Sequence, residues 1–178
     1  DKSLKISDLI SKFPESNKVV AVKINNIINS LDSYLDYNAT VEPIYLNSKE
    51  GSEIYRRTLC FVLAAAAKKL FPSKRLIVGH SICHSYYYTI FGQNEILQEE
   101  ITLLKNEILR IIEQKLPIES KTIPYSDAIN LFSKQNMNDS VAKLNYICSP
   151  FVKINSIENF SDLFFHPLLI NSSQLQDR

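Results

Sequence analysis

The segment SEIYRRTLCFVLAAAAKKLFP, residues 52–72, constrains the fold of this 178-residue chain more than any other stretch. Its apolar side chains recur every three or four residues, and this spacing predicts one long helix with a wide apolar face. Ser52 is the expected N-cap, and Pro72 is expected to end the helix. The alanines at 64–67 have small side chains, so another element can approach closely. The chain is therefore expected to pack other elements against this helix.

Residues 1–50 predict a small α/β unit ahead of that helix. A short segment with helical spacing opens it, and VVAVKINN at 19–26 is a short buried strand. This strand runs into Asn25-Asn26, a pair suited to a turn in the left-handed region. TVEPIYLN at 40–47 is a second strand. The pattern fits a half-barrel or ubiquitin-like sheet.

Beyond residue 50, helices and strands alternate. RLIVGHSICHSYYYTIFG at 75–92 has two β-rich halves joined by a tight connection, which predicts a β-hairpin. A long helix is expected over 95–116, where Pro117 stops it. Shorter elements follow: a strand at 121–124, helices at 126–135 and 139–147, a strand at 151–154 and an irregular tail. The predicted fold class is α+β, with long helices on an antiparallel sheet.

Composition excludes several classes of function. The chain holds only three glycines and lacks GxxxxGK[ST] and GxGxxG, so by itself it is not a P-loop enzyme. Its 20 basic and 19 acidic residues nearly cancel, which argues against binding nucleic acid or membranes by bulk charge. Three cysteines favour reduced thiols in a cytoplasmic protein. No signal peptide or membrane segment is visible, and the start without Met indicates a piece of a longer chain.

The segment GHSICHSYYY at 79–88 raises the question of a metal site. His80 and His84 are spaced as in a zinc-binding HExxH helix. However, Ser81 replaces the glutamate, and the hairpin pattern removes the helical geometry. A metal site assembled from distant residues stays open as an alternative; its candidates are Cys60, Cys148 and His166.

The same segment raises two further alternatives. Cys83 beside His84 suggests a nucleophile and its base, although neighbours on an extended strand point to opposite faces. The tyrosines at 86–88 would suit stacking on a base or an adenine ring. An aromatic strand with Tyr86 and Tyr88 on one face and Tyr87 on the other is the favoured interpretation.

Taken in order, several segments resemble the amino-terminal half of threonyl-tRNA synthetase. They are NSKEGSEIYRRTLCFVLAAAAKKLFP, RLIVGHSICHSYYY, the long helix, PYSDAINLF and ENFSDLFFHPLLI. In that family a small TGS domain precedes an editing domain, the second additional domain, which alanyl-tRNA synthetase shares. The same pair opens bacterial uridine kinase-like proteins, in which a P-loop kinase domain follows. The resemblance implies a TGS-like domain over 1–50 and an editing-like domain over 51–178.

The resemblance also implies that the editing chemistry is lost. In the synthetase domain, HxxxH on the first long helix and CxxxH near the domain's end build the metal-binding or hydrolytic site. The matching positions here are Phe61, Ala65, Phe164 and Leu168. None of these side chains ligates a metal or activates water, so neither a metal nor a catalytic residue is expected.

Two segments favour the kinase-linked branch: YRRTLCF at 55–61, and GHS at 79–81 with the tyrosines at 86–88. This branch implies a non-catalytic, ligand-binding or regulatory region of an ATP-dependent uridine kinase. ATP and Mg²⁺ would serve the kinase domain that follows, which would also be a partner of this chain. The chain itself would bind a nucleotide, an amino acid or an RNA end between the long helix and the sheet. The candidate residues for that ligand are Arg56, Arg57, His80, His84 and Tyr87.

Two alternatives belong to other classes of function. One is an aminoacyl-tRNA deacylase that uses Cys83, His80 and His84 in place of the lost residues. The other is an RNA-binding module related to threonyl-tRNA synthetase, whose affinity would depend strongly on salt.

Overall fold

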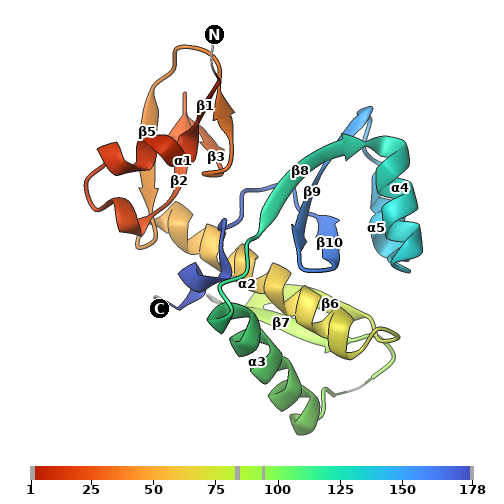
Figure 1. The fold of residues 1–178 in the computed structure, drawn as a ribbon. Helices are drawn as coiled ribbons and strands as arrows, with labels where there is room; N and C mark the ends of the chain where they lie inside the picture. The colour runs from red at the N-terminus through yellow and green to blue at the C-terminus, as the bar shows by residue number, and fades with distance from the viewer. Residues whose placement is uncertain (1–2, 83–84, 94, 177–178) are drawn as a thin grey trace. The chain divides into compact units, whose positions relative to one another are not determined.

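The computed structural model describes residues 3–82, 85–93 and 95–176 (Figure 1). Helices alternate with strands that pair antiparallel, so the α+β class predicted from the sequence is confirmed. The chain divides into two compact units: residues 1–58 with 117–171, and residues 59–116 with 172–178. This division concerns packing alone, so the expected domain boundary at residue 50 stays a prediction.

The amino-terminal part of the first unit is a small antiparallel sheet with its own core. Its elements are β1 (Leu4–Lys5), α1 (Ile6–Leu9), the 3-10 turns η1 (Ile10–Lys12) and η2 (Ser16–Lys18), β2 (Val19–Ile24), β3 (Ile27–Asn29), β4 (Tyr34–Leu35) and β5 (Val41–Tyr45). β2 lies between β3 and β5, while β1 pairs with β4. Asn25 and Asn26 have φ values of 48° and 69°, so the predicted left-handed turn joins β2 to β3. The buried core consists of Ile6, Val19, Val22, Ile24 and Leu31.

α2 (Lys49–Leu70) is the long helix predicted from the sequence, but it begins before the expected cap. Ser48, not Ser52, caps it: Ser48 Oγ accepts the Gly51 N–H at 3.0 Å and donates to the Tyr45 carbonyl at 2.8 Å. Gly51 therefore lies in the first helical turn rather than at a boundary. A Cβ atom on Gly51 would lie 2.0 Å from the Tyr45 carbonyl oxygen, so the close approach of two backbone segments requires glycine.

The later part of the first unit is a three-stranded sheet packed against two helices. Its elements are β8 (Glu119–Pro124), α4 (Tyr125–Lys134), α5 (Asn138–Leu144), β9 (Phe151–Ile157) and β10 (Phe160–Leu163), with β9 between the other strands. Their shared core consists of Ala128, Phe132, Leu144, Val152, Ile154 and Leu163. The irregular tail expected from Ile157 onward was wrong at its start. Glu158 adopts a φ of 49° and reverses the chain, so that β10 pairs with β9.

A buried hydroxyl joins α2 to the segment that follows β10. Thr58 is fully buried. Its Oγ1 donates to the Ile54 carbonyl at 2.8 Å and accepts the Leu169 N–H at 3.0 Å. The Thr58 hydroxyl therefore provides the acceptor for the Leu169 N–H, which has no acceptor within a helix or a strand.

Replacing Thr58 with valine should lower the free energy of unfolding by about 1–3 kcal/mol, because the Leu169 N–H then stays buried without its acceptor. Thr58→Ser keeps the hydroxyl and loses one methyl group, which costs only about 0.8 kcal/mol. Urea unfolding followed by circular dichroism would rank the two variants. A valine variant as stable as the serine variant would show that the hydrogen bond contributes little.

The second unit combines a hairpin with two helices. Its elements are residues 59–70 of α2, β6 (Leu76–Ile82), β7 (Ser85–Ile90), α3 (Gln98–Glu113) and η3 (Ser172–Leu175). β6 and β7 form the predicted hairpin. The Ser172 hydroxyl donates to the Ile111 carbonyl at 2.7 Å, and its N–H donates to the Leu116 carbonyl at 2.9 Å, so η3 is fixed at the end of α3. Within the described ranges, no helix combines the length and hydropathy needed to cross a membrane.

Candidate functional site

The candidate ligand residues are distributed over both units. Arg56 and Arg57 lie on α2 within the first unit, whereas His80 on β6 and Tyr87 on β7 belong to the second. His84 lies outside the described residues, as does Cys83. The two arginines therefore belong to one unit and the described hairpin residues to the other, and a joint ligand site remains a prediction.

Arg57 is oriented by a neighbour on its own helix. Its Nη2 donates to Glu53 Oε2 at 3.1 Å, one helical turn earlier, and both side chains are partly exposed. Pairs of this kind contribute only about 0.3–0.5 kcal/mol to stability. A guanidinium carries five N–H donors in a planar fork that matches carboxylate and phosphate groups. The Glu53 bond therefore directs Arg57 while leaving it suited to an anionic ligand.

A β-bulge positions His80 beside Tyr87. Val78 pairs with Tyr88 and Ser81 pairs with Tyr86, so Gly79 and His80 together lie opposite Tyr87. The His80 and Tyr87 ring centroids are 5.6 Å apart with an interplanar angle of 23°, an offset-stacked arrangement. Both side chains are exposed. The bulge thus presents two flat rings to solvent, which suits a planar ligand.

The opposite face of the hairpin lies against α2. Tyr88 Oη and Cys60 Sγ are 3.1 Å apart, and Ile90 is buried. Burial, and then the hydrogen bond with Cys60, raise the pKa of Tyr88 well above its ordinary value. This phenol is therefore neutral at physiological pH and serves as a hydrogen-bonding group rather than a base. The alternation expected for the three tyrosines is confirmed, because Tyr87 is more exposed than its two neighbours.

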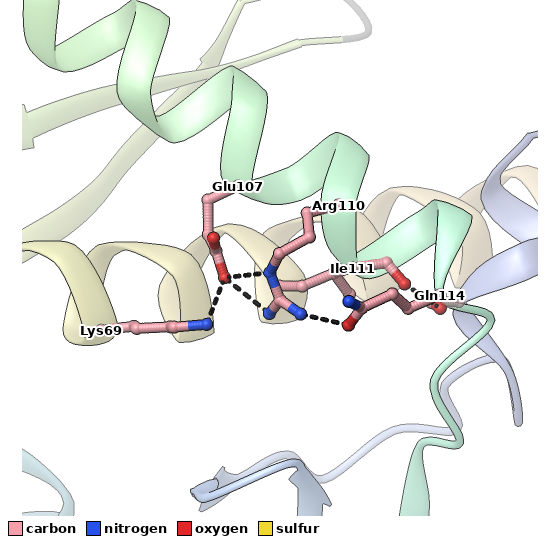
Figure 2. A network of polar contacts seen from close by, with 6 residues as sticks. Lys69, Glu107, Arg110, Ile111 and Gln114 are labelled. Carbon is pink, nitrogen blue, oxygen red and sulfur yellow. Dashed lines mark hydrogen bonds and ion pairs between the residues drawn. The ribbon is translucent and has the colours of Figure 1, made fainter.

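An ion network joins α2 to α3 within the second unit (Figure 2). Glu107 Oε1 accepts Lys69 Nζ at 2.9 Å, and it also accepts Nε of Arg110 at 2.9 Å and Nη2 of Arg110 at 2.6 Å. Arg110 also donates to Gln114. Only 11% of the Glu107 side chain is exposed. Arg110 first, and Lys69 in addition, hold the pKa of Glu107 below its ordinary value. The network therefore fixes α3 against the last turns of α2.

A second ion pair lies at the start of α3. Lys74 Nζ donates to one carboxylate oxygen of Glu100, and the other oxygen accepts the Leu97 N–H at 2.9 Å. The Lys74 ammonium, followed by the Leu97 amide, holds the pKa of Glu100 below its ordinary value. Lys69 in the last turn of α2 and Lys74 after it are therefore both paired with carboxylates of α3, which reduces the positive charge around the end of α2.

Replacing Glu107 with glutamine should lower the free energy of unfolding at pH 7 by about 1–2 kcal/mol, because hydrogen bonds to a charged group are lost. Since folding depresses the pKa of Glu107, its carboxylate stabilises the folded state above pH 4.5, the ordinary pKa. That contribution should disappear as pH falls through the lower folded-state pKa. The difference between wild type and Glu107→Gln should therefore shrink below about pH 4.5.

Glu113→Gln is the matched control, because Glu113 is an exposed glutamate on the same helix. Its effect should stay within about 0.5 kcal/mol at pH 7. Urea unfolding curves recorded between neutral and acidic pH would compare the three proteins. Equal losses in both variants would mean that the network does not contribute to stability.

The positions at which the family resemblance places the hydrolytic groups hold no metal-binding donor. Phe61 and Ala65 on α2 are buried. Phe164 and Leu168 follow β10, and Leu168 is also buried. No cluster of three His, Cys, Asp or Glu side chains occurs in the part of the chain that the structure describes. The side chains of these four residues do not fit a metal ion.

Sequence reasoning missed an exposed pair at the base of the hairpin. The guanidinium carbon of Arg75 lies 5.5 Å from the ring centroid of Phe91, and 68% of Phe91 is exposed. The Phe91 N–H donates to the Arg75 carbonyl at 2.8 Å, so the pairing of the two strands extends to this point. The sequence did contain a signal for Phe91. Phe91 and Tyr87 are an even number of residues apart, and side chains with this spacing lie on the same face of a strand.

Comparison with known proteins identifies the class of the chain's relatives. No protein-family model matches it. The curated proteins that it resembles include aminoacyl-tRNA synthetases, more particularly threonine–tRNA ligases. The chain is 31% identical over 91% of its length to the ligase of Lawsonia intracellularis and 25% identical over 99% to that of Clostridioides difficile. It is 27% identical over 88% of its length to the ligase of Francisella tularensis subsp. novicida.

These relatives confirm the resemblance to threonyl-tRNA synthetase expected from the sequence, and the chain is a module related to that enzyme. The chain spans about a quarter of their length, 25% of the first and 28% of the second. The expected nucleoside-kinase parent receives no support from them.

Proposed function

We propose that the chain is a tRNA-contacting module that has kept the framework of a threonyl-tRNA synthetase region and lost its hydrolytic chemistry. The observation that carries the proposal is a contrast between the similarity of the whole chain and the residues at the hydrolytic positions. Similarity to threonine–tRNA ligases extends over 88–99% of the sequence. Yet Phe61, Ala65, Phe164 and Leu168 occupy the positions at which the resemblance places the hydrolytic groups.

The chemistry of ester hydrolysis supports the loss of activity. Cleaving an aminoacyl ester requires a metal or a general base that activates water. The side chains of Phe61 and Ala65 offer neither, and both are buried. Binding does not need those groups, because it depends on surface cations, hydrogen bonds and flat rings. We therefore assign recognition without hydrolysis to the module.

The ligand that fits this proposal is the end of an RNA strand, with or without its amino acid. Arg56 and Arg57 are the candidate contacts for phosphate or carboxylate groups on α2. His80 and Tyr87 are candidates for contact with a base, because their rings stack and are exposed. His84 remains a candidate from the sequence. A free nucleotide or a free amino acid is a smaller candidate ligand, because it carries some of the same phosphate, carboxylate or base groups.

Two measurements test the proposal. In the first, fluorescence anisotropy with a threonine-specific tRNA should show saturable binding that weakens with salt, and Arg57→Ala should weaken it. Tyr146→Ala is the control, since Tyr146 is 87% exposed and lies outside the candidate set. In the second, a mischarged tRNA should lose its amino acid no faster with the protein than without it. Absence of tRNA binding would overturn the proposal.

The hydrolysis measurement also tests the deacylase alternative. If the protein accelerates ester loss and Cys83→Ala abolishes that acceleration, the chain is an enzyme that uses Cys83 with His80 and His84. The exposed position of His80 on the bulge favours this alternative. The loss of the family's hydrolytic residues opposes it.

A nucleoside-kinase parent is the second candidate function, and the segments at 55–61 and 79–88 are what favour it. In that case the module would regulate a cytoplasmic uridine kinase domain, which alone would need ATP and Mg²⁺. Titration calorimetry with uridine and with uridine nucleotides tests it directly. Binding of these ligands without any binding of tRNA would reverse the order of the two candidates.

A further inference from the structure

One face of the β6–β7 hairpin carries several side chains, and only some of them belong to the proposed ligand site. Strand alternation places Tyr87, Thr89 and Phe91 on the side opposite Tyr88, which contacts Cys60 of α2. The cross-strand neighbours of these residues complete the surface. We call it the outer hairpin face; it consists of Arg75, Ile77, His80, Tyr87, Thr89 and Phe91.

Two side-chain pairs, one of two rings and one of a guanidinium and a ring, stand out on this face. At one end, His80 stacks on Tyr87 with centroids 5.6 Å apart, and 48% of Tyr87 is exposed. At the other end, Arg75 lies 5.5 Å from the Phe91 ring, which is 68% exposed. The two aromatic rings are separated by about 13 Å along the strand, at roughly 3.3 Å per residue. Large exposed rings arranged in a row on one strand are a surface that a partner is expected to cover.

The charge of the hairpin indicates the chemistry of that partner. Residues 75–91 contain no aspartate or glutamate, while the cation Arg75 lies on the outer hairpin face itself. An anionic chain can therefore run along the hairpin without meeting a carboxylate of the hairpin. Flat rings next to cations are the combination that binds unpaired nucleotides, because bases stack on the rings and phosphates approach the cations.

The bulge supports the geometry of this surface. A Cβ atom on Gly79 would lie 3.2 Å from the Tyr87 carbonyl oxygen and 3.5 Å from a carbon of the Tyr87 ring. Glycine at this position thus lets the two strands approach closely while His80 turns onto Tyr87. Without the extra residue of the bulge, strand alternation alone would not place His80 opposite Tyr87.

We propose that the outer hairpin face binds an unpaired RNA strand, with one base on Tyr87 and His80 and a second base on Phe91 beside Arg75. This inference rests on the proposed role in tRNA contact and adds to it a defined surface and a preference for single strands. A duplex keeps its bases stacked inside the helix, so it cannot offer their faces to these rings.

The test uses a short fluorescent oligouridine, the matching RNA duplex and the full chain. Oligouridine should bind more tightly than the duplex. Tyr87→Ala and Phe91→Ala should each weaken oligouridine binding roughly tenfold, the loss expected for one stacked base. Tyr87→Phe and Phe91→Tyr keep the rings and should bind nearly as well as wild type, which separates stacking from any effect on folding.

Tyr146→Ala is again the control, because it removes an exposed ring from outside the hairpin, and its affinity should equal that of wild type. The inference is overturned if oligouridine does not bind, if the duplex binds as well, or if both hairpin variants bind like wild type. Oligouridine carries neither a tRNA fold nor an amino acid. Its result therefore stands apart from the tRNA measurement: loss of tRNA binding alone removes the proposed function, and an unchanged affinity of the hairpin variants alone removes this surface.

Discussion

Replacing Phe61 with alanine is expected to lower the free energy of unfolding by about 3–5 kcal/mol, the range measured for large-to-small changes in well-packed cores. Phe61 is fully buried on α2, and Ala65 and Ala66 on the same helix are buried as well. Side chains as short as these cannot move into the space that the ring leaves. Because domains of ordinary size are stable by only about 5–15 kcal/mol, the variant should unfold at a much lower urea concentration.

The matched control is Phe165→Ala, since 66% of Phe165 is exposed and the chemical change is the same. It should change the free energy of unfolding by no more than about 0.5 kcal/mol. Phe61→His adds a functional comparison, because it restores a donor of the type that the resemblance places here. A buried imidazole without a hydrogen-bonding partner is costly, so this variant should also be destabilised. Equal stability of the histidine variant and wild type would show that the site can readily regain a ligand.

The second large effect is expected for Gly51→Ala. This substitution should lower the free energy of unfolding, whereas replacing glycine with alanine inside a helix generally raises it. Alanine normally stabilises a helix interior by about 1 kcal/mol relative to glycine. Here the new Cβ would lie 2.0 Å from the Tyr45 carbonyl oxygen and 2.9 Å from the carbonyl carbon. Both are backbone atoms, so the end of β5 or the start of α2 must move. A loss of about 3 kcal/mol is expected, the upper part of the range for overpacking.

Gly92→Ala makes the same chemical change for a different physical reason. Gly92 has a φ of 80°, and nothing lies within 4 Å of the position of its Cβ. The cost there is backbone strain alone, about 1–2 kcal/mol. Thermal unfolding of the two variants would separate the mechanisms. A Gly51→Ala variant that is as stable as wild type would contradict the close approach of Tyr45 to α2.

The sequence predicted those elements whose signals are local. The asparagine pair at 25–26 predicted the β2–β3 turn, and the apolar spacing of 52–72 predicted α2. The β-rich halves of 75–92 gave the hairpin. By contrast, β10 was missed because its turn uses Glu158 in the left-handed region, where sequence reasoning looks for glycine or asparagine. The start of α2 was misplaced because Ser48 and Ser52 are both suitable N-caps in the sequence, and only the structure shows that Ser48 accepts a backbone N–H of the first turn.

For the candidate site, Tyr87 and His80 were predicted from the sequence as ligand residues, but the stacking of their rings was not predicted. Their stacking depends on a bulge, and a bulge is an extra residue in a pairing register that no single strand reveals. Arg75 and Phe91 were missed for the same reason, since their contact joins the two ends of the hairpin. Arg56 and Arg57 were assigned from the sequence alone, and tRNA binding by their variants is what tests them.

By itself, then, the sequence determined the α+β class, the long helix, the hairpin and the resemblance to threonyl-tRNA synthetase. Each of these depends on periodicity, turn residues or ordered motifs that lie close together along the chain. Only the tertiary structure decided why Gly51 is glycine, where Thr58 finds its second partner and which rings share the outer hairpin face. Those features depend on atoms that are distant in sequence and adjacent in space, and a residue pattern carries no record of such distances.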